Sequence, residues 1–263
     1  MKKTEKKHTY SIPFKFKGVM LLLGFLTTFV AGVTASNAGH NNNHIRNYDI
    51  PVGQFHSFSV DDNVNVVYRC VEDSAGRVSY KGDDRFDNAF IFSVNNGHLR
   101  IQVNTEDVND PELPVLYIYS EYLTKVSNSS DFNVTVESVS PTPRLDIIQI
   151  GNGSINVENI KATKVTGKIN TGHGNIVLSG KCNNACLTIV GTGTIQADRL
   201  KSETVDCKIM GGGTIGCWPE ENLNIRGIGS TKIYYKGQPK VNKKGGGHAI
   251  PLDTTNPKEI YLP

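Results

Sequence analysis

One pattern recurs in the second half of the chain: Gly151-Asn-Gly-Ser-Ile-Asn-Val157, Gly172-His-Gly-Asn-Ile-Val-Leu178, Gly191-Thr-Gly-Thr-Ile-Gln-Ala197 and Gly211-Gly-Gly-Thr-Ile-Gly-Cys217. Looser copies follow at Gly227-Ile-Gly-Ser-Thr-Lys-Ile233 and Gly245-Gly-Gly-His-Ala-Ile250, and a degenerate forerunner stands at Asn128-Ser-Ser-Asp-Phe-Asn-Val134. The second glycine or its equivalent falls at positions 130, 153, 174, 193, 213, 229 and 247, in steps of 23, 21, 19, 20, 16 and 18 residues. Such a repeat indicates a solenoid, in which each repeat is one coil and is too thin to fold alone.

The length of the repeat suits one coil of extended chain. About twenty residues at ~3.3 Å each give a path of roughly 65 Å, enough for a closed coil of short strands and corners. Stacked coils pair edge to edge at ~4.8 Å, so their corners superpose into columns. Glycine suits such a corner because it permits both a positive φ and a close approach to the coils above and below.

Apolar residues after each turn are expected to fill the interior of the coils. The isoleucine of the pattern and the residue two places further share one face by the period-two rule. The two resulting ladders are Ile155, Ile176, Ile195 and Ile215, and Val157, Leu178, Ala197 and Cys217. We therefore predict a right-handed parallel β-solenoid over residues 127–252, with Cys217 as a core residue rather than a reactive one.

The first half of the chain reads as short strands separated by turns. Residues 60–68 alternate apolar and polar side chains, and residues 115–119 form another strand, which Pro111 and Pro114 precede. Residues 89–94 and 99–103 flank Asn95-Asn-Gly97, which predicts a hairpin with an Asn-Gly turn. No helical period is visible after the N-terminal segment. We expect an antiparallel strand region over residues 49–126, an all-β fold, and a C-terminal tail over residues 253–263.

The N-terminus has the features of a secretory signal peptide over residues 1–35. Six lysines and one acid lie before Gly18, and residues 19–35 carry no charge. The apolar run Val19–Val33 is shorter than the ~20 residues that span a bilayer, and small residues allow cleavage after Ala35 or Ala38. The first cysteine is Cys70, which argues against a lipid anchor. We expect a polar linker over residues 36–48, no membrane span after cleavage, and a periplasmic or cell-surface location.

The formal charge of +3 comes from this basic start. Without it, 22 basic and 24 acidic residues remain, a net charge of −2. On that basis we expect no nucleic-acid partner and no general attraction to anionic lipid.

Five cysteines are present, at positions 70, 182, 186, 207 and 217. The Cys182-x-x-x-Cys186 spacing is not that of a metal knuckle, and no histidine lies close to it. The odd count argues against a complete disulfide framework. We expect several buried thiols with one bridge among the five, and the pairing is left open.

Motifs that would indicate a cofactor or a metal have simpler explanations. Gly211-Gly-Gly-Thr-Ile-Gly216 matches G-x-G-x-x-G, but Cys-Trp-Pro219 follows instead of a helix. Calcium-binding solenoids place an aspartate after the glycine turn, where this chain has neutral residues: Ser154, Asn175, Thr194 and Thr214. His40 and His44 read as solvated spacer, and His173 as a tolerated corner residue. We predict no cofactor, no metal and no cofactor-binding residue.

Catalytic residues are not predicted either. The acids of the repeats are scattered among coils, and no two of them occupy matched places on adjacent coils with a lysine or arginine between: Asp146, Glu158, Asp198, Glu203 and Asp206. Three glycosylation sequons, at Asn128, Asn133 and Asn152, are explained as by-products of Asn- and Ser-rich turns. Binding residues are left unassigned.

The chain resembles a bacterial family described as putative auto-transporter adhesin, head GIN domain. The resemblance rests on the glycine repeats with Val64-Asn-Val-Val67, Asn96-Gly-His-Leu-Arg-Ile101 and Tyr235-Lys-Gly-Gln-Pro-Lys-Val241, and covers roughly residues 50–252. It implies a secreted or envelope-facing β protein with a right-handed β-helix, and it carries over no catalytic residue. An auto-transporter ends in a membrane barrel of alternating ~10-residue strands. The ending Lys258-Glu-Ile-Tyr-Leu-Pro263 lacks that pattern, so we expect display to need another route or a partner.

The leading functional hypothesis is an exported, non-catalytic, adhesin-like binding module that presents a rigid polar face to a glycan or protein partner. The first alternative is a carbohydrate-active β-helix enzyme, which loss of polymer in the presence of the protein would support. The second is a structural envelope protein that associates with copies of itself, which concentration-dependent association would support.

Overall fold

The computed structural model describes residues 45–104 and 112–252, all within one compact unit, Asn42–Pro263. It is all-β, with 67% strand, 3% helix and a β-solenoid of about 6 turns, so the predicted fold class is confirmed. The predicted signal peptide and tail and most of the linker lie outside the described residues and stay predictions. Within the described ranges, no helix is long and apolar enough to cross a membrane.

The first strands are short. They are β1 (Arg46–Pro51), β2 (Ser57–Val60), β3 (Val66–Cys70), β4 (Arg77–Gly82), β5 (Phe90–Asn95), β6 (His98–Val103), β7 (Leu116–Ser120), β8 (Lys125–Asn128) and β9 (Asn133–Val136). Two 3-10 helices lie among them, η1 (Glu72–Ser74) and η2 (Asp84–Phe86). The later strands are β10 (Thr142–Gln149), β11 (Ser154–Ile169), β12 (Asn175–Gly191), β13 (Thr194–Gly211), β14 (Thr214–Ile228), β15 (Lys232–Tyr235), β16 (Lys240–Gly245) and β17 (His248–Pro251).

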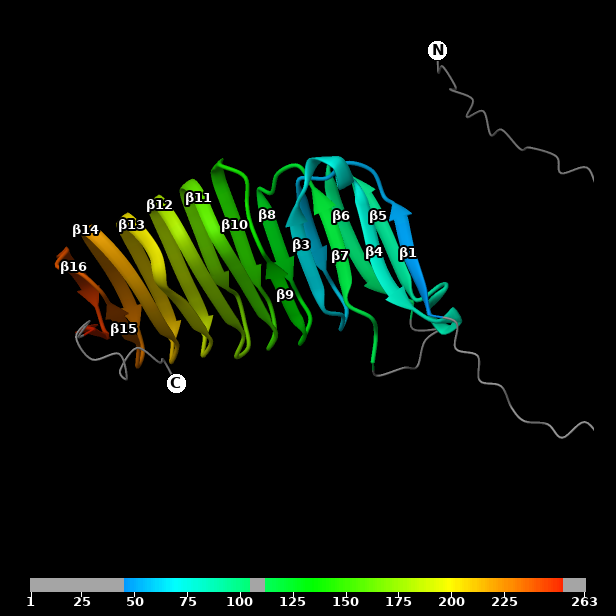
Figure 1. The fold of residues 1–263 in the computed structure, drawn as a ribbon. Helices are drawn as coiled ribbons and strands as arrows, with labels where there is room; N and C mark the ends of the chain where they lie inside the picture. Colours follow the sequence, from blue (N-terminus) through cyan, green and yellow to red (C-terminus); the bar gives the residue numbers. More distant parts are fainter. Residues whose placement is uncertain (1–44, 105–111, 253–263) are drawn as a thin grey trace, which may run out of the picture. The chain divides into compact units, whose positions relative to one another are not determined.

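The repeats form successive coils that pair in parallel. Strands β11, β12, β13 and β14 lie in that order, each bonded to the next (Figure 1). Their register aligns the pattern residue for residue, because Ile155 pairs with Ile176, which pairs with Ile195. Each of these long strands bends through corners, so one strand supplies most of a coil.

The predicted inward ladder of isoleucines is present and longer than the repeats indicated. Its members pair in register across the stack and are 0–1% exposed: Leu116, Val66, Val134, Ile155, Ile176, Ile195, Ile215 and Ile233. Burying one such side chain stabilises the fold by about 1.5–3 kcal/mol. Cys217 is 0% exposed, which confirms that it is a core residue.

In the four regular turns the two glycines have different roles, whereas in the looser copies the second glycine, Gly229 or Gly247, has a positive φ. In the regular turns the first takes a positive φ, +84° at Gly172 and +135° at Gly211. The second lies against the carbonyl of the coil before it, so a Cβ on Gly193 would stand 2.5 Å from Gly174 O. That carbonyl accepts a hydrogen bond from Thr194 N at 3.1 Å, and Gly193 O accepts one from Thr214 N at 3.1 Å. The second glycines therefore form the single column that the repeat predicts.

The turn at Asn128-Ser-Ser130, the forerunner of the repeats, has no glycine. Hydrogen bonds from the Asn128 side chain hold its backbone instead. Asn128 Oδ1 accepts hydrogen bonds from Ser130 N at 3.0 Å and Ser130 Oγ at 2.8 Å. Asn128 Nδ2 donates to Phe132 O at 2.9 Å. Since Asn128 is fully buried, its sequon is not available for modification.

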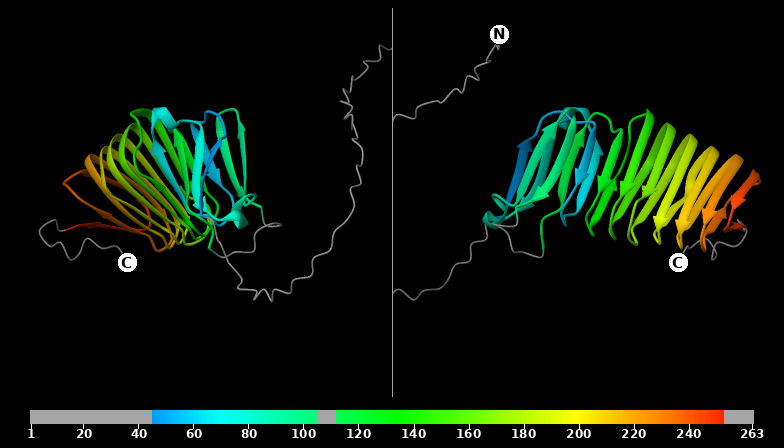
Figure 2. Two further views of the ribbon diagram at one scale, coloured as in Figure 1. Left: turned by 45° about the vertical axis from the view of Figure 1, so that its right-hand side comes forward. Right: turned by 180° about the vertical axis from the view of Figure 1, so that it is seen from behind.

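The predicted hairpin is present, but the N-terminal strands also extend the parallel stack. Strands β5 and β6 are antiparallel around Asn96 and Gly97, which have φ of 50° and 71°. The pairs β1–β4 and β4–β7 are antiparallel too. Strand β2, however, pairs in parallel with β6 and β8, and β3 pairs in parallel with β7 and β9. The β2–β3 coil therefore lies between coils that follow it in the chain (Figure 2).

All five cysteines are free thiols, so the expectation of one bridge among them is wrong, and Cys207 and Cys217 meet in the interior. A hydrogen bond with Cys217, together with burial, raises the pKa of the Cys207 thiol well above its ordinary value. Both residues are at most 1% exposed, whereas Cys70 and Cys186 are half-buried.

We expect the turn glycines to differ sharply in their tolerance of alanine. In Gly211-Gly-Gly213, a Cβ on Gly213 would stand 2.8 Å from Ile189 Cγ2 and 2.9 Å from Gly193 O. Gly213→Ala should therefore lower the free energy of unfolding by about 1–3 kcal/mol. Gly212→Ala is the matched control, because its Cβ would meet only Thr192 Cγ2 at 3.6 Å, and its effect should stay within about 0.5 kcal/mol. Denaturant titration measures both, and equal effects would contradict the assigned roles.

We also expect the cysteines to divide into two classes of reactivity. Cys70 and Cys186 should be alkylated by iodoacetamide in the native protein, because both are half-buried, and Cys186 should react more slowly because burial raises the pKa of its thiol. Cys182, Cys207 and Cys217 should react only on unfolding, because they are buried and the pKa values of Cys182 and Cys207 are raised. Peptide mass spectrometry checks the pattern, and native labelling of Cys207 or Cys217 would show that the interior opens.

Candidate functional site

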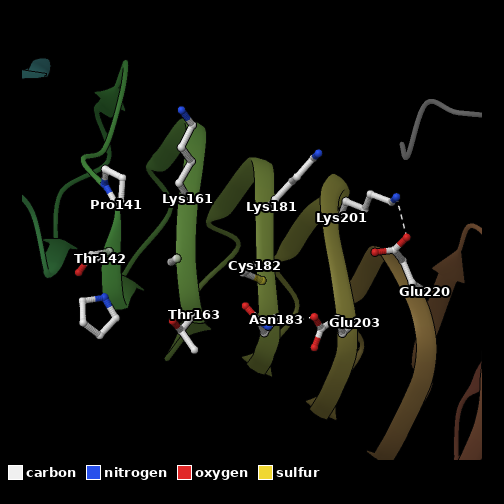
Figure 3. A pocket seen from close by; sticks show the side chains of 12 residues that line it. Pro141, Thr142, Lys161, Thr163, Lys181, Cys182, Asn183, Lys201, Glu203 and Glu220 are labelled. Carbon is white, nitrogen blue, oxygen red and sulfur yellow. Dashed lines mark hydrogen bonds and ion pairs between the residues drawn. The ribbon is translucent and has the colours of Figure 1, made fainter.

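A groove of about 620 Å³ runs across successive coils, from Pro141 at one end to Glu220 at the other. One edge is a row of lysines, Lys161, Lys181 and Lys201, which pair in register on β11, β12 and β13. Figure 3 shows the three side chains side by side along the edge of the groove. Adjacent coils lie ~4.8 Å apart, so the stack fixes the spacing of the positive charges.

The opposite edge is a row of polar side chains two residues further along each coil. Thr163, Asn183 and Glu203 form it (Figure 3). Asn183 Nδ2 donates a hydrogen bond to Glu203 Oε1 at 2.9 Å, which joins two coils across the groove wall. This row offers hydroxyl, amide and carboxylate groups to a ligand.

Small side chains lie between the two rows, and those of Thr142, Ala162 and Cys182 form the floor of the groove. Thr142, Ala162, Cys182 and Ser202 pair in register from β10 to β13. Cys182 Sγ lies 3.2 Å from Ser202 Oγ, and Ser202 Oγ donates to Leu200 O at 3.3 Å. Burial raises the pKa of the Cys182 thiol, which therefore stays protonated and is a poor nucleophile.

The charge of the groove changes along its length. Lys201 Nζ lies 2.6 Å from Glu220 Oε1, so the β13–β14 end is neutralised. Lys161 and Lys181 are exposed and form no ion pair with any residue that the structure describes. The β11–β12 end therefore presents two uncompensated ammonium groups.

An aromatic residue continues the lysine row. Trp218 pairs with Lys201 in register, and its ring centroid lies 5.9 Å from Lys201 Nζ and 5.6 Å from Lys236 Nζ. Lys236 is held in turn by an ion pair with Asp198 at 3.0 Å, with side chains only 14% and 12% exposed.

The acids weighed from the sequence lie mostly elsewhere. Asp146 pairs with Arg144 at 2.8 Å, Asp206 accepts from Asn224 Nδ2 at 2.9 Å, and Glu158 accepts from Asn156 Nδ2 at 3.0 Å. Of the five, Glu203 alone lines the groove.

Sequence reasoning missed the lysine row and Glu220. A signal was available, because Lys161, Lys181 and Lys201 recur every twenty residues, in step with the glycine turns. Glu220 had no such signal, since β14 departs from the regular register between Ala197 and Lys201 of β13 and again between Ser202 and Thr204.

The remaining motifs have the following places. Gly211 ends β13 and the turn leads into strand β14, not into a helix. His173 is an exposed corner residue whose backbone N donates to Asn152 Oδ1 at 3.3 Å. The described residues contain no group of three or more His, Cys, Asp or Glu that could hold a metal ion. His40 and His44 lie outside the described residues.

A family model described as putative auto-transporter adhesin, head GIN domain, matches residues 54–239. Among curated proteins, none matches this sequence.

Solved structures share the fold at low sequence identity. A putative adhesin from Bacteroides fragilis has a TM-score of 0.70 and 22% identity, with coverage of 79% of this chain and 97% of that one. A putative adhesin from Parabacteroides merdae has a TM-score of 0.64, 22% identity, and coverage of 81% and 98%. A putative lipid binding protein from Parabacteroides distasonis has a TM-score of 0.62, 19% identity, and coverage of 81% and 98%.

Proposed function

The chain belongs to the family described as putative auto-transporter adhesin, head GIN domain, and from this premise we propose that it is an exported binding module that holds an extended acidic glycan in its lysine-lined groove. The family fits a non-catalytic binding module and a cell-surface or extracellular location. The glycan and the groove as its site are our proposal.

The observation that carries the proposal is the lysine row at the unneutralised end of the groove. Lys161 and Lys181 point from consecutive coils into one open groove, and neither has an acidic partner among the described residues. A polymer with negative charges repeated along its length can meet such a row without rearranging it. The parallel stack holds the lysine backbones in place, so only their side chains lose conformational entropy on binding.

The other features of the groove favour a glycan over other polyanions. Thr163 and Asn183 supply hydrogen-bond donors and acceptors that suit sugar hydroxyls. Trp218 offers an aromatic ring next to the lysine row, at the neutralised end. The volume of the groove, about 620 Å³, also falls in the usual range of ligand sites.

The groove also sets the orientation of its ligand. Glu203 and Glu220 repel carboxylates at the β13–β14 end, so the acidic sugars are expected at Lys161 and Lys181. Neutral sugars are expected beside Glu203 and Trp218.

We expect Lys161→Ala/Lys181→Ala to bind polygalacturonate about tenfold more weakly than the parent chain, since an exposed ion pair contributes about 0.2–1 kcal/mol. Isothermal titration calorimetry at low and high salt provides the measurement, with neutral dextran as the comparison polymer. Lys232→Ala/Lys243→Ala is the matched control, because it removes the same charge from β15 and β16, outside the groove. Equal losses in the two double variants would show that binding follows net charge and not the groove.

A second candidate function, glycan cleavage, is favoured by one observation. Glu203 and Glu220 line the same groove with Lys201 between them, a combination that β-helix enzymes could use. Both glutamates are exposed, and each is occupied, by Asn183 and by Lys201 respectively. This arrangement suits ligand positioning better than proton transfer.

We therefore expect no new reducing ends or unsaturated products when the protein is incubated with polygalacturonate. Chromatography of the polymer before and after incubation tests this. Cleavage that disappears in Glu203→Gln and Glu220→Gln, and persists in the Lys232→Ala control, would establish an enzyme and reject the binding module.

A further inference from the structure

Charge is strongly segregated along this chain. Residues 45–141 contain 7 Lys and Arg against 15 Asp and Glu, a net charge of −8. Residues 142–252 contain 14 against 7, a net charge of +7. The small net charge of the whole chain thus hides a basic solenoid. The expectation of no attraction to anionic lipid, drawn from that net charge, therefore does not apply to each face separately.

Much of this positive charge lies on the side of the coils that precedes each glycine turn. Lys168, Thr188, Lys208, Arg226 and Lys244 pair in register there from β11 to β16. Lys208, Arg226 and Lys244 are exposed, and within the described ranges none of them forms an ion pair. Asp206 is the one carboxylate that lines the pocket formed with Lys208 and Arg226, and it accepts a hydrogen bond from Asn224 Nδ2.

An exposed apolar column runs beside these charges. Val190 pairs with Met210, which pairs with Ile228, and their exposed fractions rise from 37% to 57% and 70%. Residues two apart on a strand point to the same side, so Lys208 and Met210 share a face, as do Arg226 and Ile228. A single exposed apolar residue is ordinary, but three on successive coils form a continuous strip.

We propose that this face, made of Lys208, Arg226, Lys244, Val190, Met210 and Ile228, docks on the surface of an anionic lipid bilayer. The cations would meet lipid phosphates while Met210 and Ile228 insert among the headgroups. A pocket of about 150 Å³ on this face is lined by Thr188, Lys208 and Arg226 together with the Asp206 carboxylate, so we expect the lipid phosphates at the exposed ends of the cations and not inside the pocket. A nucleic acid or an acidic glycan would use the charges but leave the apolar strip in water, so the bilayer fits both features.

Docking of this face is independent of the proposed glycan site. The groove lies on another side of the coils, where Lys161, Lys181 and Lys201 pair in register. Either surface could therefore lose its ligand while the other keeps its own, and separate variants distinguish them.

The test is co-sedimentation of residues 36–263 with two kinds of vesicle. One contains phosphatidylcholine alone, and the other contains phosphatidylcholine and phosphatidylglycerol in equal amounts. We expect binding only to the anionic vesicles. Lys208→Ala/Arg226→Ala/Lys244→Ala should reduce partitioning about a hundredfold, because each basic residue contributes about 1 kcal/mol near an anionic surface. Met210→Ser/Ile228→Ser, which keeps every charge, should reduce it about tenfold.

Lys161→Ala/Lys181→Ala is the matched control, because it removes lysines from the groove and should change partitioning by less than about threefold. Circular dichroism confirms that each variant is folded. No difference between the two kinds of vesicle would overturn the proposal. So would an unchanged affinity in Met210→Ser/Ile228→Ser, since that result would identify a surface for soluble polyanions.

Discussion

Hydrogen bonds at the Gly-x-Gly turns hold adjacent coils of the solenoid together. In each, a backbone N–H group donates to a glycine carbonyl of the preceding coil. Asn175 N bonds to Gly153 O, Thr194 N to Gly174 O, and Thr214 N to Gly193 O, at 3.0–3.1 Å. A side chain on the second glycine of any of these turns would displace the carbonyl. The rest of the parallel register follows, because once corners align, the strands between them align too.

That register turns local sequence into long-range order. Each outward position of a coil repeats about 4.8 Å away on the next, so one residue type kept in phase becomes a ladder. The lysine row of the groove and the apolar strip of Val190, Met210 and Ile228 both arise in this way. Neither surface needs a loop or a helix to shape it, and the shared scaffold keeps their chemistry apart on different sides.

The interior was readable from the sequence because its signals are local and periodic. The isoleucines stand two places after the second glycine, so the period of two and the spacing of the turns together place them inside. The Asn-Gly hairpin was equally readable, since Asn96 and Gly97 supply the positive φ that a two-residue turn needs. Where a turn lacked glycine, as at Asn128, the side-chain bonds that replace it could not be foreseen from spacing.

The sequence by itself determined that the chain is an all-β solenoid, where its Gly-x-Gly turns lie, and that Cys217 is interior, because steric demands at glycine and the period of the strand act over a few residues. Only the tertiary structure decided that β2 and β3 insert between later coils, that Glu220 reaches Lys201, and that the positive charges gather on two separate faces. Those outcomes depend on which strand edges meet and how far each register shifts. Such choices join residues tens of positions apart, and no pattern within one repeat specifies them.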